Sequence, residues 1–184
     1  DPSRGENWSL EELSWRRALA GPRPIAALVA ALPPRGQRWT PETAAAFVEK
    51  IWHRCLLFAI TPTVKEAWAS PDLMEIVRPI YRRMIPIVER LETAGWQCAT
   101  LARADRGDVF LERYGGGEEG EILLAVHSES EQPIATRITV DWEGLGLEIP
   151  AEIGDLVSGE PMEISEGTIS VPLDPGRTAV LSLR

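Results

Sequence analysis

The spacing of hydrophobic residues changes near residue 95. Before this point apolar residues recur every three or four positions, with two short runs that are apolar throughout. After it they alternate with polar residues, and turn residues recur about every 8 to 12 positions. The first pattern is typical of helices mixed with buried strands, and the second of antiparallel strands. We therefore expect an α/β part over residues 1–95 and an all-β part over residues 96–184.

The longest predicted helix covers residues 71–94. Pro71 suits its first position, and Gly95 directly follows its end. Pro79 and Pro86 each remove a backbone donor, which predicts kinks without a break. A single apolar stripe runs along this helix through Leu73, Ile76, Val77, Ile80, Tyr81, Met84, Ile85, Val88 and Leu91.

Two shorter helices are predicted upstream. One lies in SLEELSWRRAL and ends before Gly21, and the other begins at Thr40 in TPETAAAFVEKIW. Between the helices, PIAALVAAL and CLLFAI are apolar on both faces, as strands of a helix-covered parallel sheet are. CLLFAI also fits a continuation of the helix before it. Alternating helices and strands predict an α/β sheet or barrel.

The second part contains a series of predicted strands and turns. In PIATRITVDW every second residue from Ile134 to Trp142 is apolar or Thr, so these residues share one face of a half-buried strand. The closing segment VPLDPGRTAVLSLR is predicted to form a hairpin through its Asp-Pro-Gly turn. Seven or eight such strands in 89 residues predict a compact antiparallel β-sandwich. The predicted strand segments are WQCATLAR, DVFLERYG, EILLAVHSE, PIATRITVDW, EIGDLVSGE, TISVPL and TAVLSLR.

The α/β part is incomplete by itself, because parallel strands need neighbours for their backbone groups and cover on both faces. We interpret residues 1–95 as the last part of a larger α/β body. The missing strands would then lie on another segment of the protein or on another chain. The alternative is that both apolar runs are helical and form a small cap on the sandwich.

The composition and the charge distribution exclude some classes of function. Hydrophobic residues make up 44% of the 184 residues, and no apolar run is long enough to span a membrane. Residues 1–95 hold 13 Arg and Lys against 11 Asp and Glu, whereas residues 96–184 hold 6 against 17. An acidic second part repels phosphate backbones, and the first part has no basic block, so we expect no nucleic-acid partner.

The inventory of metal-binding side chains is small. Cys55 and Cys98 have no ligand spacing, and His53 and His127 are the only histidines, so we expect no metal site. Two buried thiols are the favoured interpretation, and one disulfide stays open and would suit an exported protein. The chain starts with Asp1 and not with Met, which we interpret as a processed form or a fragment.

Several segments in order resemble the C-terminal region of bacterial glycoside hydrolases. They run from SWRRALAGPRPIAALVAALPP through ETAGWQCATLAR and EILLAVHSES to DLVSGE and the closing VPLDPGRTAVLSLR. In those proteins a (β/α)₈ barrel is followed by an antiparallel β-sandwich. The resemblance implies that PIAALVAAL and CLLFAI are the seventh and eighth barrel strands, that the substrate is a carbohydrate, and that no cofactor is needed.

Barrel enzymes carry their chemistry at the C-terminal ends of strands, which here means LPPRGQRW and TPTVKEAW. Glycoside hydrolysis normally uses two carboxyl groups. Only Glu42 and Glu66 follow these strands, and both are better explained as residues at a helix start. The resemblance therefore implies that the catalytic carboxylates lie outside this chain.

Seven Trp residues are present, and Trp is the usual platform for stacking on sugar rings. Trp39 and Trp68 follow the two presumed strands and are our candidates for substrate contacts, although packing at the barrel rim also explains them. Trp96 and Trp142 are expected in the core. The acidic, glycine-rich YGGGEEGE is expected to be a loop between two strands.

Three functional hypotheses follow. The leading one is the C-terminal portion of a glycoside hydrolase, whose sandwich stabilises the barrel by covering the helix over residues 71–94. The second is a non-catalytic carbohydrate-binding or interaction module with a helical appendage. The third is a structural domain that pairs with a separate subunit.

Overall fold

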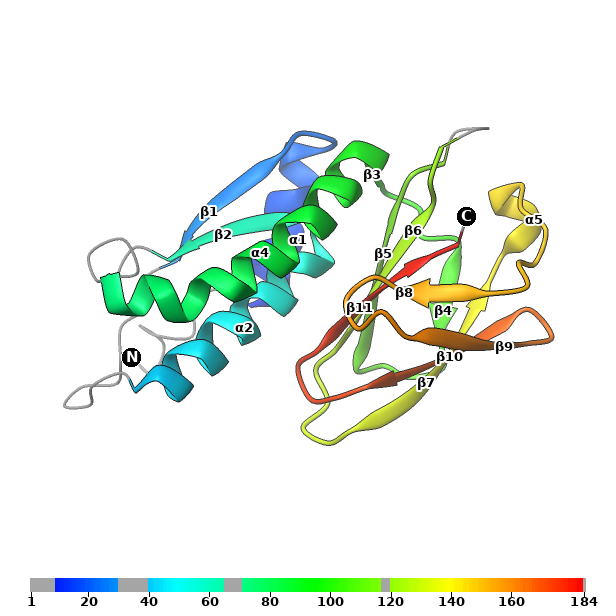
Figure 1. Ribbon diagram of the computed structural model, residues 1–184. Coiled ribbons are helices and arrows are strands. Elements are labelled where there is room, and N and C mark those ends of the chain that lie inside the picture. Colours follow the sequence, from blue (N-terminus) through cyan, green and yellow to red (C-terminus); the bar gives the residue numbers. More distant parts are fainter. Residues whose placement is uncertain (1–8, 30–39, 65–70, 117–119, 184) are drawn as a thin grey trace.

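The structure is a computed structural model and describes residues 9–29, 40–64, 71–116 and 120–183. Three helices and a two-stranded sheet form one side of the molecule, and a β-sandwich forms the other (Figure 1). The order of elements along the chain follows the change of hydrophobic period in the sequence. A helix-rich stretch comes first, and antiparallel strands follow it.

The predicted helices are present, and short capping motifs set where they begin. Helix α1 (Leu10–Ala20) starts with a capping box, in which the Ser9 hydroxyl accepts from the backbone of Glu12 and the Glu12 carboxylate accepts from the backbone of Ser9. Helices α2 (Pro41–Leu57) and α4 (Pro71–Ala94) both have proline at the first position. Helix α4 continues through both of its internal prolines, as expected.

The two apolar runs behave differently. PIAALVAAL contains strand β1 (Ile25–Val29), as predicted, which rules out the helical alternative for this segment. CLLFAI, in contrast, mostly continues α2, and strand β2 (Ile60–Val64) starts at its last residue. The strand prediction for CLLFAI was wrong because the end of α2 is buried on all sides, so its last turn is as apolar as a covered strand.

Strands β1 and β2 pair in parallel, with Ile25 opposite Ile60. Among the described residues neither strand has a second partner, so one edge of each is unpaired. Residues Ala27 and Ile60 point toward the helices and are buried, whereas Ala26 on the opposite face is exposed. Within the described residues, this small sheet is therefore covered on one face only.

The second part forms one nine-stranded antiparallel sheet that curls into two packed layers. The inner layer has the order β3-β5-β6-β11-β8, and the outer layer has the order β9-β10-β7-β4, with β8 paired to β9 where they join. The predicted β-sandwich is confirmed. Its strands are β3 (Trp96–Gln97), β4 (Ala102–Ala104), β5 (Val109–Tyr114), β6 (Leu123–Ser128), β7 (Ile134–Val140), β8 (Ile153–Asp155), β9 (Pro161–Ser165), β10 (Thr168–Leu173) and β11 (Thr178–Ser182).

Alternation in the sequence located most of these strands. In β7 the residues Thr136, Ile138 and Val140 are buried and their neighbours are exposed, as predicted. Strand β9 was missed, because its five residues contain only two apolar side chains on the inward face, Met162 and Ile164. The YGGGEEGE segment joins the adjacent strands β5 and β6, as predicted.

The closing segment is not a hairpin. Strand β10 pairs with β7 and β9 in the outer layer, whereas β11 pairs with β6 and β8 in the inner layer. The turn at Asp174–Arg177 therefore carries the chain from one layer to the other. The hairpin prediction was wrong because a four-residue turn between alternating strands fits both a hairpin and a crossing between layers, and only the partners on both edges distinguish them.

Two hydrophobic cores meet at the inner layer. Side chains that point away from the helices, such as Leu124 and Leu181, fill the interior of the sandwich. Their neighbours Leu123, Ala125 and Val180 point the other way and share a core with α2 and α4. We call this contact surface between the inner layer and the two helices the seam. The sandwich thus covers α2 as well as the predicted α4.

We predict that Asp155 fixes β8 against β11. Its carboxylate accepts from the backbone N–H groups of Val157, Ser158 and Val180, at 3.0, 3.0 and 2.8 Å. Asp155→Ala leaves the buried N–H of Val180 unsatisfied, removes the acceptor of Val157 and Ser158, and should lower the free energy of unfolding by about 3 kcal/mol in urea denaturation. The exposed Asp174→Ala is the control and should change it by less than about 0.5 kcal/mol. Equal effects of both substitutions would contradict this role.

Candidate functional site

The edge where β1 and β2 end is the predicted place for substrate contacts. Because the strands are parallel, their C-terminal ends meet at the same edge of the sheet. Trp39, Trp68 and Glu66 lie outside the described residues. Glu42 is exposed in the first turn of α2, and hydrogen bonds with its own backbone and with Thr40 lower the pKa of its carboxyl. The described residues therefore bring no pair of carboxylates to this edge.

The remaining Trp side chains are mostly packed inside the protein. Trp142 is buried and donates to the carbonyl of Gly167 at 2.7 Å, as expected for a core residue. Trp96 is half-buried and donates to the carboxylate of Glu112 at 2.6 Å. Trp52 packs edge-on against Tyr81 in the helical core. Trp15 on α1 is 63% exposed, and the described part of the sandwich presents no exposed Trp for stacking on a sugar.

The two cysteines differ in environment. Cys55 is buried, and burial raises the pKa of its thiol to about 12. Cys98 is exposed, so the expectation of two buried thiols was wrong for this residue, and both thiols are free. No group of three His, Cys, Asp or Glu side chains that suits a metal ion occurs among the described residues. Within the same residues no helix has the length and apolar character needed to cross a bilayer.

A first cluster of polar side chains lies where α2 ends. The Tyr114 hydroxyl from β5 donates to the carbonyl of Leu57 at 2.7 Å. Arg17 from α1 donates from Nε to the carbonyl of Phe58 and from Nη2 to that of Ala59, both at 2.8 Å. Its Nη1 donates to the carbonyls of Gly21 and Arg23. These donors satisfy carbonyls that a helix end otherwise leaves unpaired.

Burial shifts the protonation equilibria around Arg17. Desolvation lowers the pKa of this guanidinium and raises the pKa of Tyr114 well above its ordinary value. Burial also raises the pKa of Glu92 and of Glu112, and the charge of Arg17 partly offsets this. The carboxylates do not bond to Arg17, whose donors point to backbone carbonyls. This cluster holds elements together and presents no open site.

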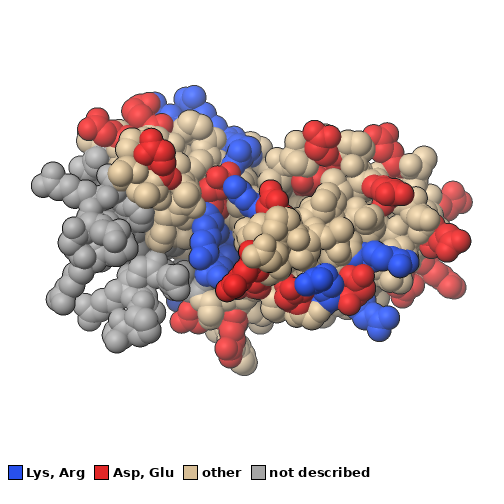
Figure 2. All heavy atoms as spheres, turned by 90° about the horizontal axis from the view of Figure 1, so that it is seen from below, with Lys and Arg blue, Asp and Glu red and all other residues tan. Residues whose placement is uncertain are grey.

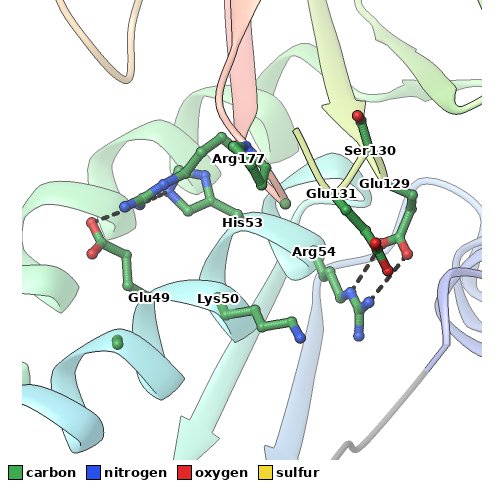
Figure 3. A pocket seen from close by; sticks show the side chains of 11 residues that line it. Glu49, Lys50, His53, Arg54, Glu129, Ser130, Glu131 and Arg177 are labelled. Atoms are coloured by element: carbon green, nitrogen blue, oxygen red, sulfur yellow. Dashed lines mark hydrogen bonds and ion pairs between the residues drawn. The ribbon is translucent and has the colours of Figure 1, made fainter. Parts of the chain in front are cut away.

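A second polar cluster lies where α2 meets the turn between β10 and β11 (Figure 3). His53 Nδ1 lies 3.1 Å from the backbone nitrogen of Thr178, and its Nε2 lies 2.7 Å from Nη1 of Arg177. Arg177 and Arg83 also donate to one oxygen of Glu49, at 2.9 and 2.5 Å. Burial alone raises the pKa of Glu49, but these two arginines outweigh it and hold that pKa below its ordinary value.

The cluster continues into the sandwich. The Thr178 hydroxyl donates to the carbonyl of His53 at 2.5 Å and lies 2.8 Å from Nδ1 of His127. The other ring nitrogen of His127 lies 3.1 Å from Glu129, which also accepts a two-pronged bond from Arg54. The bond from His127, followed by the charge of Arg54, lowers the pKa of Glu129 to about 2.

A pocket of about 450 Å³ opens beside this cluster. In Figure 3 its labelled charged side chains come from α2 and from two sandwich loops. Arg54 and Arg177 are each paired with a glutamate, and no Trp, Tyr or Phe among the described residues lines the pocket. On the face drawn in Figure 2, acidic side chains are spread over the sandwich with basic ones among them. The pocket is therefore a polar hollow between packed elements, without the stacking surface that sugars favour.

Sequence reasoning did not find either cluster. His53 and His127 were considered only as metal ligands, and Arg17 and Arg177 carried no motif. The decisive contacts join residues far apart, such as Thr178 and His53, which are separated by 125 positions. The only local signal was the Asp-Pro-Gly turn, which correctly marked a change of direction just before Arg177.

The fold is shared with parts of glycoside hydrolases, as comparison with solved structures shows. An α-amylase from Anoxybacillus matches with a TM-score of 0.50 and 13% identity, over 92% of this chain and 40% of the amylase chain. AmyP, solved in complex with maltose, matches with a TM-score of 0.51 and 11% identity, over 82% and 37%. A candidate α-N-acetylgalactosaminidase from Bacillus halodurans matches with a TM-score of 0.50 and 13% identity, over 82% and 34%.

These likenesses show a glycosidase-like fold at low sequence identity. The chain spans 34% to 40% of the length of these three structures. No protein-family model matches the sequence, and a search of curated proteins finds no match. One fold can carry many activities, so the function of the chain depends on its own site residues.

We predict that Arg17→Lys strongly destabilises the protein. Lysine has no fork of donors to reach four carbonyls, so buried acceptors lose their partners. The free energy of unfolding should fall by about 3 to 5 kcal/mol in urea denaturation. Arg82→Lys, at an exposed position of α4, is the matched control and should change it by less than about 0.5 kcal/mol. A loss below 1 kcal/mol for Arg17→Lys would argue against this assignment.

Proposed function

We propose that this chain is the C-terminal portion of a (β/α)₈-barrel glycoside hydrolase. In this proposal residues 1–95 supply the last units of the barrel and residues 96–184 form an accessory sandwich. The catalytic carboxylates lie on strands outside this chain. The observation that carries the proposal is the parallel pair β1 and β2, whose outer edges are both unpaired within the described residues.

A closed barrel accounts for what this pair lacks. Each strand of a barrel has a neighbour on both edges, so the free backbone groups of β1 and β2 gain partners. The exposed face that carries Ala26 becomes the packed interior of the barrel, while the helices stay outside. The similarity to parts of longer glycoside hydrolases supports the same arrangement.

The sandwich has a stabilising role in this proposal. It contributes Tyr114, Leu123 and Val180 to the helical core, and Tyr114 also caps the end of α2. By burying the outer sides of α2 and α4 it shields helices that a bare barrel leaves open to water. The described surface of the sandwich presents no exposed Trp, and the sandwich brings no pair of carboxylates to the edge where β1 and β2 end. We therefore assign it no catalytic role.

We further propose Trp39 and Trp68 as substrate contacts. Each follows a strand of the parallel pair, and residues after the C-terminal ends of barrel strands surround the substrate. Indole rings stack on the apolar faces of sugars. The remainder of the barrel, on an upstream segment or another chain, is then the required partner.

A comparison of two lengths of the gene product tests the proposal. The chain from Asp1 to Arg184 should release no product from a panel of aryl glycosides and oligosaccharides, whereas a product that includes the upstream coding segment should hydrolyse at least one of them. Activity of the short chain alone would refute it, and so would the absence of both an upstream coding segment and a second chain that completes the barrel.

The same longer product tests the two tryptophans. Trp39→Ala and Trp68→Ala should each raise KM about tenfold, which corresponds to about 1.4 kcal/mol of lost binding. Trp96→Phe, which removes an indole N–H that faces Glu112 at the seam, is the control and should leave KM unchanged. Unchanged KM in both alanine variants would contradict their assignment.

A further inference from the structure

The ring of His53 is held between two hydrogen-bond donors. The side chain is buried, with 2% of the residue exposed. The backbone N–H of Thr178 points to Nδ1, and the guanidinium of Arg177 points to Nε2. Neither group has a lone pair to offer, because an amide N–H and a guanidinium only donate. We call this arrangement of His53, Thr178 and Arg177 the His53 contact.

The His53 contact depends on the protonation state of the ring. A neutral imidazole has one nitrogen that accepts, so it satisfies one of the two donors, and Arg177 has Glu49 as a further acceptor. A protonated imidazole carries a hydrogen on both nitrogens and accepts nothing. Protonation therefore replaces the hydrogen bond with donors facing donors on both sides of a buried ring.

The surrounding charges add to this conflict. Arg177 in the turn before β11, Arg83 on α4 and His127 on β6 all disfavour a positive charge on His53. Glu49 on α2 favours it, but its carboxylate is already shared by two arginines. Burial first, and then the charge of Arg177, lower the pKa of His53 to about 4.

The same residues join the helices to the sandwich. Thr178 is the first residue of β11, and its hydroxyl donates to the carbonyl of His53 on α2. Since that hydroxyl has a single proton, it accepts from Nδ1 of His127, while Glu129 accepts from the other ring nitrogen. The two ring nitrogens of His127 thus face acceptors, whereas those of His53 face donors, on either side of Thr178.

We propose that the His53 contact is an acid-sensitive connection, which holds the turn before β11 against α2 while the ring is neutral and releases it when the ring is protonated. Release means that Arg177 and Thr178 separate from His53, while Val180 stays in the helical core. The interiors of the sandwich and of the helical part stay folded, because their cores contain no part of this contact. The proposal does not depend on a glycosidase activity.

The direction of the pH effect follows from the lowered pKa. A released His53 titrates near its ordinary value of about 6.5, and the packed one near 4. The released form therefore binds more protons between these values, so the contact is fully present above about pH 6.5 and weakens as the pH falls toward 4. The equilibrium for opening should rise about 30-fold between pH 7.5 and pH 5.

Hydrogen exchange measured by mass spectrometry on the 184-residue chain tests this prediction. After correction for intrinsic exchange rates, opening at the Thr178 amide, which bonds to His53, should rise about 30-fold from pH 7.5 to pH 5 in peptides that cover residues 177–181. Peptides from β7 and β10 in the outer layer are the internal reference and should change little. An equal rise in all peptides, or no rise at the contact, would overturn the proposal.

Two variants separate His53 from other causes. His53→Asn keeps an acceptor near Nδ1 but does not titrate, so the pH dependence at the contact should disappear. Tyr114→Phe removes a different side-chain bond at the seam, so it should increase opening at every pH and keep the 30-fold rise. If His53→Asn keeps the rise of the unmodified chain, the proposal is wrong.

A direct titration covers the case in which His53→Asn does not fold. The chain has two histidines, so their Hε1 protons give two NMR signals, and the nearness of the His53 ring to Thr178 and Arg177 assigns them. A titration midpoint below pH 5 for His53 supports the proposal, and a midpoint at pH 5 or above overturns it.

Discussion

The end of α2 is the constraint on which the rest of the structure depends. A helix leaves its last carbonyls without partners, and here that end lies between a sheet and a sandwich, away from water. Tyr114 and Arg17, from two other elements, supply the missing donors. Because an unpaired buried carbonyl costs about 1 to 3 kcal/mol, α1, α2 and the inner layer are fixed to one another at this point.

The two polar clusters differ in how they respond to pH. The one around Arg17 bonds to backbone carbonyls with a group that stays charged at every accessible pH, so its strength is insensitive to acidity. The one around His53 uses a ring whose ability to accept depends on a proton. The sandwich itself is bonded to α2 by the Tyr114 hydroxyl, whose raised pKa keeps it protonated, and by the His53 contact, which depends on pH. The open sheet β1 and β2 lies on the opposite side of the helices (Figure 1).

Local rules in the sequence predicted the local structure well. Thr40 before α2 and the proline at the start of α4 marked real helix starts, and the alternation in β7 marked its buried face. Predictions failed where residues far apart in the sequence determine the local structure or the strand pairing. The last turn of α2 is apolar because two other elements cover it, and the partners of β10 and β11 depend on strands up to 59 residues away, as Ser182 opposite Leu123 shows. His53 and Arg177 form no motif in the sequence, because they are 124 positions apart and interact only once the chain is folded.

The position of β11 has a consequence for how the protein is made. This strand lies in the middle of the inner layer, between β6 and β8, and it is translated after every other described strand. Until it emerges from the ribosome, β6 presents an unpaired edge, α2 lacks the hydroxyl of Thr178, and β8 has no hydrogen-bonded partner in the inner layer. During this interval the helical part and the incomplete sandwich are present without β11 between them. A chaperone or a neighbouring nascent chain can then bind the exposed edge of β6.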